Sequence, residues 1–206
     1  DPVESAAVAE VARQVHAYQQ RNAGCPAQIT RALIVAMGGM LPGSLLHDHL
    51  ASGRSEGTPA IEFGTVGVSL YESPGVRYDK PRILHTMSVD IAGHTVLLVD
   101  DLGDYGGTLE FLSDHVMERG AAGVLSAVLY LKPAARQRGC VDFHFGETDQ
   151  ETWIITPRER VETLVKRVPV WRDRGADIGE CRRRLVELIG YPPYLVDDYL
   201  PAAFAG

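Results

Sequence analysis

The stretch Val96-Leu-Leu-Val-Asp-Asp-Leu-Gly-Asp-Tyr-Gly-Gly-Thr108 carries the strongest structural signal in this sequence. Its first four residues are apolar, which is typical of a strand buried in a parallel sheet. Asp100 and Asp101 follow where that strand ends, and a short turn that contains glycines comes next. From Thr108 onward, apolar residues recur three and four positions apart. The stretch therefore predicts a strand, a tight loop and a helix.

The loop has the composition of a phosphate site beside a site for hydroxyl groups. Gly106 and Gly107 allow the backbone to approach an anion closely, and a helix N-terminus presents backbone N–H groups to it. In open α/β sheets, ligands bind at the carboxyl ends of strands. Asp100 and Asp101 would repel a bare phosphate, so vicinal hydroxyls, with the help of a Mg²⁺ ion, suit them better. A ribose 5-phosphate combines both features.

These residues resemble the phosphoribosyl pyrophosphate (PRPP) signature of type I phosphoribosyltransferases, in which two acids and an Asp-Thr-Gly-x-Thr loop follow an apolar strand. Asp104-Tyr-Gly-Gly-Thr108 matches that loop except at Tyr105, where the family usually has a small hydroxyl residue. A Walker A loop is excluded because no Gly-Lys-Ser or Gly-Lys-Thr follows the glycines.

The resemblance implies a role for each residue of the signature. Asp100 and Asp101 are expected to hold the ribose hydroxyls and to organise the Mg²⁺ cofactor. Asp104 is the candidate catalytic acid or base near the reacting nitrogen. The residues expected to bind the 5-phosphate are Tyr105, Gly106, Gly107 and Thr108.

A second glycine pair follows another predicted strand, Leu33-Ile-Val-Ala36. Glycines at such a position allow close approach to a ligand. In the resembled family this loop binds pyrophosphate and commonly has Arg or Lys just before the glycines, so Gly38 and Gly39 are candidate pyrophosphate residues. Met37 stands at the basic position. A plain strand-to-helix turn is the alternative interpretation.

Lys132-Pro-Ala-Ala-Arg136 and Thr152-Trp-Ile-Ile155 narrow the resemblance to 6-oxopurine phosphoribosyltransferases, nearest to the short bacterial xanthine-guanine type. There a lysine binds the purine 6-oxo group, and a Trp-Ile pair supplies a stacking ring and backbone carbonyls. Lys132, Trp153 and Ile154 occupy those positions. A lysine offers a cation to an electron-rich oxygen, and a tryptophan offers a flat apolar face. The alternative interpretations are that Lys132 is a solvated surface residue and that Trp153 is a core residue.

Strand and helix patterns alternate along the chain, which predicts an α/β fold with a mostly parallel twisted sheet and helices on both faces. We expect a phosphoribosyltransferase-like domain over 1–167 that includes a small base-binding hood at about 132–160. Residues 168–206 are expected to form a helical C-terminal extension that packs on the core or on a second subunit. Strands are predicted at 33–36, 61–71, 83–89, 96–99 and 124–131, after a helix at 3–20.

Residues 72–82 are rich in Pro, Gly and charge, which indicates a loop. In the resembled family a mobile loop after a Ser-Tyr-type strand end closes over PRPP, and Ser69-Leu-Tyr71 with the following segment occupies that place. Such lids exclude water from the reacting centre. A plain hairpin connection is the alternative.

The composition is that of an ordinary soluble globular protein, with 206 residues, 45% hydrophobic and 23% charged. A net charge of −7 weighs against a broad nucleic-acid surface, and no apolar run approaches membrane-spanning length. Three well-separated cysteines without zinc spacing indicate reduced thiols. We therefore expect a cytoplasmic protein, a homo-oligomer such as a dimer, with no nucleic-acid or membrane partner.

The favoured hypothesis is an enzyme that transfers a phosphoribosyl group from PRPP to a ring nitrogen of a purine-like base, with Mg²⁺. A second hypothesis is a non-catalytic module that senses PRPP or a nucleotide, which Met37 and Tyr105 support. A third keeps the enzyme but changes the acceptor to an unusual heterocycle. If the enzyme hypothesis holds, cations of the 72–82 segment, namely Arg77, Lys80 or Arg82, are candidates to replace the charge absent at Met37.

Overall fold

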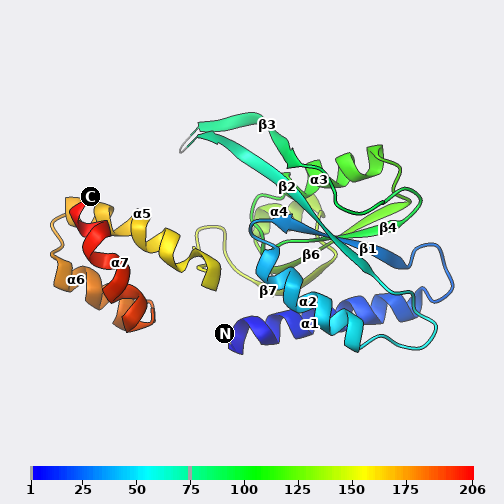
Figure 1. The fold of residues 1–206 in the computed structure, drawn as a ribbon, viewed down its shortest axis with the longest axis horizontal. Helices are drawn as coiled ribbons and strands as arrows, with labels where there is room; N and C mark the ends of the chain where they lie inside the picture. Colours follow the sequence, from blue (N-terminus) through cyan, green and yellow to red (C-terminus); the bar gives the residue numbers. More distant parts are fainter. Residues whose placement is uncertain (1, 74–75) are drawn as a thin grey trace. The chain divides into compact units, whose positions relative to one another are not determined.

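The computed structural model describes residues 2–73 and 76–206, with side chains described outside 70–80, and it divides into two compact units. The first unit ends at Thr152, and the second runs from Trp153 to Gly206. In Figure 1 the first unit is coloured from blue to yellow-green and the second from yellow to red. Each unit has a hydrophobic core of its own.

The first unit contains a seven-stranded sheet in its described residues, with the order β3-β2-β1-β4-β6-β5 and β7 paired to β6. Every pair is parallel except β2 and β3. The strands are β1 (Ile29–Ala36), β2 (Glu62–Ser73), β3 (Val76–His85), β4 (Thr95–Val99), β5 (Leu102–Gly103), β6 (Gly123–Leu131) and β7 (Phe143–Glu147). The helices are α1 (Pro2–Arg21), α2 (Met40–Ser52), α3 (Gly107–Glu118) and α4 (Pro133–Arg138). The α/β fold with a mostly parallel sheet is confirmed.

The central strand β4 is buried on both faces, which explains its unbroken apolar sequence. Alternate side chains of a strand point to opposite faces. On one face, the packed residues are Leu97 and Val99 of β4, Val8 and Val11 of α1, and Leu46 of α2. On the other face, they are Val96 and Leu98 of β4 with Leu109, Leu112 and Val116 of α3. Figure 1 shows α1 and α2 on one side of the sheet and α3 on the other, as predicted.

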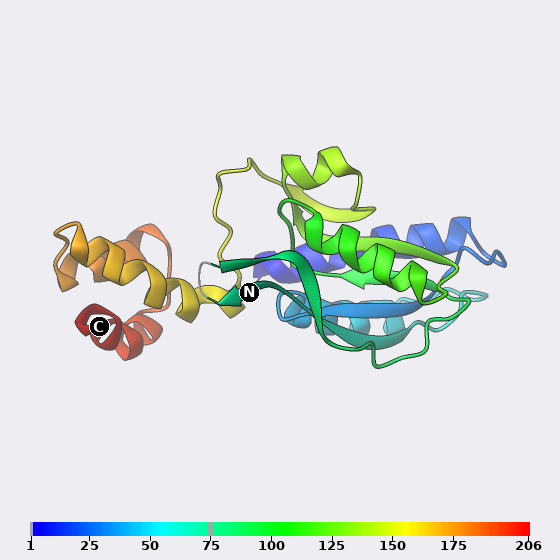
Figure 2. The ribbon, with the colours of Figure 1, turned by 90° about the horizontal axis from the view of Figure 1, so that it is seen from above.

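The segment predicted as a loop at 72–82 is largely strand in the described residues. Strand β2 continues to Ser73 and pairs antiparallel with β3, which begins at Val76. Figure 2 shows the two strands running alongside each other. Residues 74–75, and the side chains of the expected lid at 70–80, lie outside the described residues. The Pro and Gly content of this segment indicated a loop, but the pairing of β3 with β2 gives most of it a strand conformation.

The two-residue strand β5 lies in the segment predicted as a turn, and neither helix α4 nor strand β7 was predicted. Helix α4 begins directly after Lys132 with Pro133 in its first turn, where a proline is well tolerated. Strand β7 pairs with β6 through Ala127 and Phe143, and it completes the edge of the sheet. Their few residues give no clear periodicity, since each element is only five or six residues long.

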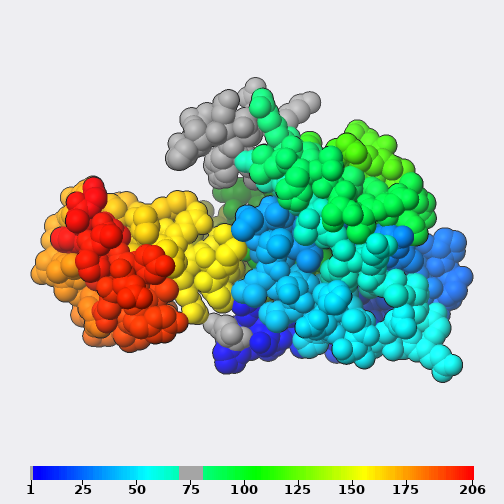
Figure 3. All heavy atoms as spheres, in the orientation of Figure 1, coloured from blue at the N-terminus to red at the C-terminus, as the bar shows by residue number. Residues whose placement is uncertain are grey.

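The second unit consists of helices around a separate core. Its elements are a 3₁₀ turn (Pro157–Glu159), α5 (Arg160–Asp173), α6 (Ile178–Arg183), a π-helical turn η2 (Arg184–Leu188) and α7 (Pro193–Ala205). The core residues include Leu164, Val168, Leu185, Val196 and Leu200. Figures 1 and 3 show α7 lying along α5. Asp177 caps α6 by accepting a hydrogen bond from the backbone N–H of Glu180 at 2.8 Å.

The structural boundary differs from the one drawn from the sequence at 167–168. Residues 160–167 belong to the helical unit, because Leu164 packs in the same core as Leu185 and Leu200. The segment predicted as a hood at about 132–160 is divided, with α4 and β7 in the first unit and Trp153 onward in the second. No helix among the described residues is long and apolar enough to cross a membrane.

Candidate active site

Asp100 and Asp101 lie at the carboxyl end of β4, where the sequence placed them. The Asp100 backbone N–H donates to the carbonyl of Ala127 at 3.0 Å, and the Asp101 N–H donates to Oδ1 of Asp100 at 3.0 Å. The Asp101 carbonyl accepts hydrogen bonds from the N–H groups of Leu129 and Tyr130, at 3.1 and 3.2 Å. Strand β6 therefore fixes the backbone that carries both carboxylates.

The glycine pair between β1 and α2 lies against the end of β4, with Gly38 next to these carboxylates. A Cβ added to Gly38 would lie 2.5 Å from Oδ1 of Asp101 and 2.7 Å from Oδ1 of Asp100. A Cβ on Gly39 would collide with the backbone carbonyls of Val99 and Val35. At Gly39 the obstacle is backbone, so only glycine fits there, whereas a side chain at Gly38 would displace the two carboxylates. The structure thus brings together four residues that were predicted from two separate motifs.

Met37 precedes this pair and is 65% exposed, at the end of a cis peptide bond with Ala36. Its thioether is a weak acceptor and carries no charge. The loop therefore approaches the carboxylates by backbone alone. Arg77, Lys80 and Arg82 were the candidates to replace the charge absent at Met37. The side chains of Arg77 and Lys80 lie outside the described residues, and Arg82, near the C-terminal end of β3, is exposed.

The second glycine pair forms the N-terminus of α3. Gly106 is the N-cap residue with φ +81°, a conformation that favours glycine, and it makes no side-chain cap hydrogen bond. A Cβ added to Gly107 would meet no atom within 4 Å, so the first turn of the helix faces open space. Thr108 follows in that turn, and Tyr105 is 55% exposed. This geometry suits an anion at the helix N-terminus.

Lys132 and Asp104 form an ion pair next to this loop. Nζ of Lys132 lies 3.1 Å from Oδ1 of Asp104. The lysine is 6% exposed, so it is not the solvated surface residue that was the alternative interpretation. The carbonyl of Gln150 accepts a further hydrogen bond from Nζ, at 3.2 Å. A buried ammonium needs such partners, because an unpaired charge in the interior is strongly disfavoured.

Gln150 is a residue of this network that the sequence analysis did not identify. Its Nε2 donates to Oδ1 of Asp104 at 2.9 Å, and its Oε1 accepts from the backbone N–H of Ala134 at 3.1 Å. It lies in the loop after β7, which has no recognisable motif. Only the polar character of the loop was available as a signal.

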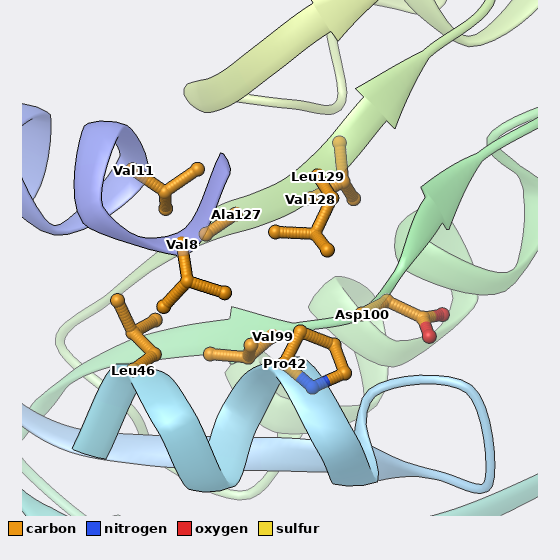
Figure 4. Close-up of a pocket in the computed structure, with 9 residues that line it drawn as sticks. All are labelled: Val8, Val11, Pro42, Leu46, Val99, Asp100, Ala127, Val128 and Leu129. Carbon is orange, nitrogen blue, oxygen red and sulfur yellow. The ribbon is translucent and has the colours of Figure 1, made fainter. Parts of the chain in front are cut away.

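A small apolar cavity of about 10 Å³ lies beside Asp100, lined by side chains of α1, α2, β4 and β6. Figure 4 shows Val8, Val99 and Leu129 around it, with the Asp100 carboxylate pointing away from these side chains. A cavity this small and apolar is a packing gap and not a site for a sugar phosphate.

Trp153 and Ile154 belong to the second unit, whereas Lys132 belongs to the first. Trp153 is 64% exposed, so it is not a core residue, and the guanidinium carbon of Arg167 lies 5.4 Å from its ring centroid. This is a cation–π contact. Trp153 and Arg167 line a cavity of about 180 Å³ together with Glu159, Glu162, Thr163 and Lys166. The base-binding set predicted from sequence is therefore divided between the units.

The donor set at the end of β4 fits a magnesium ion. Asp100 and Asp101 direct carboxylate oxygens to the same glycine, and Mg²⁺ binds through one or two carboxylates together with substrate phosphates. No cluster of three or more His, Cys, Asp or Glu side chains suited to a metal occurs in the described part of the chain. The protein would thus supply only part of the coordination sphere.

Comparison with known proteins agrees with this geometry. Residues 6–158 match the model of the phosphoribosyl transferase domain family. Among solved structures, a purine phosphoribosyltransferase from Pyrococcus horikoshii is 26% identical, with a TM-score of 0.59 over 76% of this chain and 88% of that one. A hypoxanthine-guanine phosphoribosyltransferase from L. donovani is 23% identical, with a TM-score of 0.60 over 74% and 80%. A hypoxanthine phosphoribosyltransferase from Trypanosoma cruzi is 22% identical, with a TM-score of 0.58 over 72% and 75%. The last two show the fold alone. No curated sequence matches.

Proposed function

Because this chain belongs to the phosphoribosyl transferase domain family and is a phosphoribosyltransferase, we propose that it transfers the phosphoribosyl group of PRPP to a ring nitrogen of a purine-like base. The products are a nucleoside monophosphate and pyrophosphate. The observation that carries the proposal is the close approach of the Gly38–Gly39 loop to the end of β4, where Gly38 lies against the carboxylates of Asp100 and Asp101 and Gly39 against the backbone of Val99 and Asp100. This proximity supports a pyrophosphate at the glycine loop next to the acceptors for a diol.

The proposed positions of the ribose and phosphate groups follow the roles that the resemblance implies. The 5-phosphate binds the first turn of α3, where Gly106, Gly107 and Thr108 offer backbone N–H groups and a hydroxyl. Asp100 and Asp101 accept hydrogen bonds from the ribose hydroxyls. A bound Mg²⁺ ion would neutralise charge on the pyrophosphate. Tyr105 adds its backbone to the phosphate loop and leaves its exposed ring outside it.

Asp104 and Lys132 serve the base. Asp104 removes or holds the proton of the ring nitrogen as that nitrogen forms its bond to C1 of the ribose and the C1–O bond to pyrophosphate breaks. An ammonium has three N–H donors, and two of those of Lys132 are directed to Asp104 and Gln150. The third donor is assigned to the exocyclic oxygen of the base.

A purine-like acceptor is favoured by Lys132, whose buried ammonium suits an exocyclic oxygen. Trp153 is proposed to stack on the base, and Ile154 to contact its edge through the backbone. The exposure of Trp153 supports the stacking role, since a core position would have excluded it. The Pyrococcus horikoshii relative, which is named as a purine enzyme, supports the same class.

The experiment that tests the proposal is a product screen. The protein is incubated with PRPP, Mg²⁺ and a panel of purines and pyrimidines, and the products are identified by mass. A nucleoside monophosphate from a 6-oxopurine supports the proposal. A product from another heterocycle would retain the transferase and replace the substrate class. No product from any base, together with tight binding of a nucleotide, would support a binding module instead. The cytoplasmic location and the dimer stay predictions.

A further inference from the structure

We propose that Gln150 is a positioning residue that holds Asp104 and Lys132 in their reactive arrangement. The inference rests on the proposed function, since it assigns Gln150 to the base end of that site. Three hydrogen bonds of this one residue reach three different parts of the first unit. Two of them end on the ion pair itself.

The side-chain amide of Gln150 has only one possible orientation. The backbone N–H of Ala134 in the first turn of α4 is a donor, so the amide oxygen must face it, at 3.1 Å. The amide NH₂ is then directed to Oδ1 of Asp104, at 2.9 Å. The same carboxylate oxygen also accepts from Nζ of Lys132. With Oδ1 occupied by two donors, the carboxylate presents its other oxygen to the base.

The backbone of Gln150 positions the lysine. Its carbonyl accepts a hydrogen bond from Nζ of Lys132 at 3.2 Å, which with Asp104 fixes two of the three ammonium N–H groups. Lys132 is also the N-cap residue of α4, the helix whose first turn Gln150 caps. One residue therefore connects the acid–base residue, the base-binding lysine and the helix that begins after that lysine.

The loop that carries Gln150 is itself held in shape. Oδ1 of Asp149 accepts from the N–H groups of Glu151 and Thr152, at 3.0 and 2.7 Å, and Oδ2 accepts from the Thr152 hydroxyl at 2.8 Å. These hydrogen bonds lower the pKa of Asp149, so it is ionised at neutral pH. Loss of the Gln150 side chain thus leaves the turn formed but separates it from α4 and Asp104.

Two substitutions test the proposal. Gln150→Leu removes both side-chain hydrogen bonds at similar volume. Gln150→Glu keeps an acceptor for Ala134 but replaces the NH₂ donor with a carboxyl that repels Asp104 when ionised and donates when protonated. Gln14→Leu is the matched control, because Gln14 is also half-buried and joins α1 to the backbone of His144 in β7, away from the site.

Gln150→Leu is expected to lower kcat about tenfold to a hundredfold, the usual effect of losing a hydrogen bond to a charged group. The KM for PRPP should change little, because the hydrogen bonds of Gln150 given by the described residues end on Asp104, Lys132 and Ala134 and not on the 5-phosphate residues 105–108. In Gln150→Glu, the activity relative to wild type should recover as the pH falls and the introduced carboxyl becomes protonated. A purely structural role would give no such pH dependence, and Gln14→Leu should give none.

An unchanged kcat in Gln150→Leu, or a Gln150→Glu activity ratio that does not vary with pH, would overturn the proposal. If Gln150→Leu does not fold, the pH profile of Gln150→Glu decides. If the wild type forms no nucleotide from any base, the proposed function fails, and acetylation of Lys132 measured by mass becomes the test. Gln150→Leu must then accelerate that acetylation while Gln14→Leu does not, and equal rates in both would overturn the inference.

Discussion

Nζ of Lys132 and Oδ1 of Asp104 lie 3.1 Å apart, and the lysine is almost completely buried while the aspartate side chain is 43% exposed. The pair therefore has one partner protected from water and one facing outward. The sequence separates these residues by a helix and a strand, and the parallel pairing of β5 with β6 brings them together. An acid–base group and a cation for the base thus occupy one end of the sheet.

Asp104→Asn is expected to lower kcat about 10²–10⁴-fold, because general acid–base help from a positioned side chain contributes that much. The amide also leaves the buried ammonium of Lys132 with a weaker partner, so the melting temperature should fall. Steady-state kinetics with varied base and varied PRPP measures the first effect. A kcat within a few-fold of wild type, with nucleotide still formed, would remove the acid–base role.

Gly39→Ala is expected to lower both stability and PRPP binding, whereas Gly107→Ala is expected to lower only the affinity for nucleotide. The new methyl on Gly39 collides with the carbonyls of Val99 and Val35, so the variant should unfold at a lower temperature and lose PRPP binding. The methyl on Gly107 meets no protein atom within 4 Å, so stability should be kept. That methyl lies where the proposed 5-phosphate binds, so affinity for nucleoside monophosphate should fall.

Thermal unfolding and calorimetry together distinguish the two glycine variants. Gly123→Ala is a suitable control, because its methyl would make only an ordinary contact of 3.6 Å with the Thr95 side chain. Unchanged nucleotide affinity in Gly107→Ala would move the 5-phosphate away from the N-terminus of α3.

Asp100→Asn and Asp101→Asn are each expected to weaken the binding of PRPP or nucleotide. A hydrogen bond to a charged group contributes about 1.5–3 kcal/mol, which is a tenfold to hundredfold change in affinity. Calorimetry with a nucleoside monophosphate, with and without Mg²⁺, measures the loss. If both variants keep the wild-type affinity, the ribose assignment is wrong.

His115 in α3 is expected to make the protein less stable in acid. Burial, with a smaller contribution from Arg119, lowers the pKa of His115, and its Nε2 has no hydrogen-bond partner among the described residues. Between this lowered pKa and about 6.5, the unfolded chain binds more protons than the folded one, so the free energy of unfolding falls as the pH drops through that range.

His115→Leu should therefore flatten the pH dependence of the free energy of unfolding below about 6.5. Leucine fills a similar volume, and the unpaired nitrogen is removed. Denaturant titrations at several pH values measure the slope, with His49→Leu on the exposed side of α2 as the control. An unaltered slope in His115→Leu would show that this histidine titrates normally in the folded protein.

The central strand of the fold and the loops of the candidate site could be predicted from sequence, because short local patterns determine them. Strand β4 is apolar since both its faces are buried, and Gly106 marks the left-handed turn that begins α3. Gly38 and Gly39 were predicted separately, and their contact with Asp100 and Asp101 follows from the pairing of β1 with β4.

The contacts of Gln150 and the boundary between the two units at Thr152 could not be predicted from local sequence patterns. The partners of Gln150 lie 16 and 46 positions away in the chain, and no local pattern records such contacts. The helical pattern of residues 160–167 predicts a helix but not the core against which Leu164 packs. The strand predicted at 83–89 overlaps only the end of β3, because the Pro and charged residues before it indicated a loop and no local pattern records the pairing with β2.

The most direct test of the account compares the wild type with Met37→Arg in one assay of nucleotide and pyrophosphate formed from PRPP, Mg²⁺ and each 6-oxopurine. Met37 lacks the charge that the resembled family commonly has at this position, yet Lys132, Asp104 and both glycine loops are in place. We predict that the wild type forms nucleotide and pyrophosphate in equal amounts and that Met37→Arg is as active or more active. A wild type that binds nucleoside monophosphate but never forms it, while Met37→Arg gains turnover, would contradict the account.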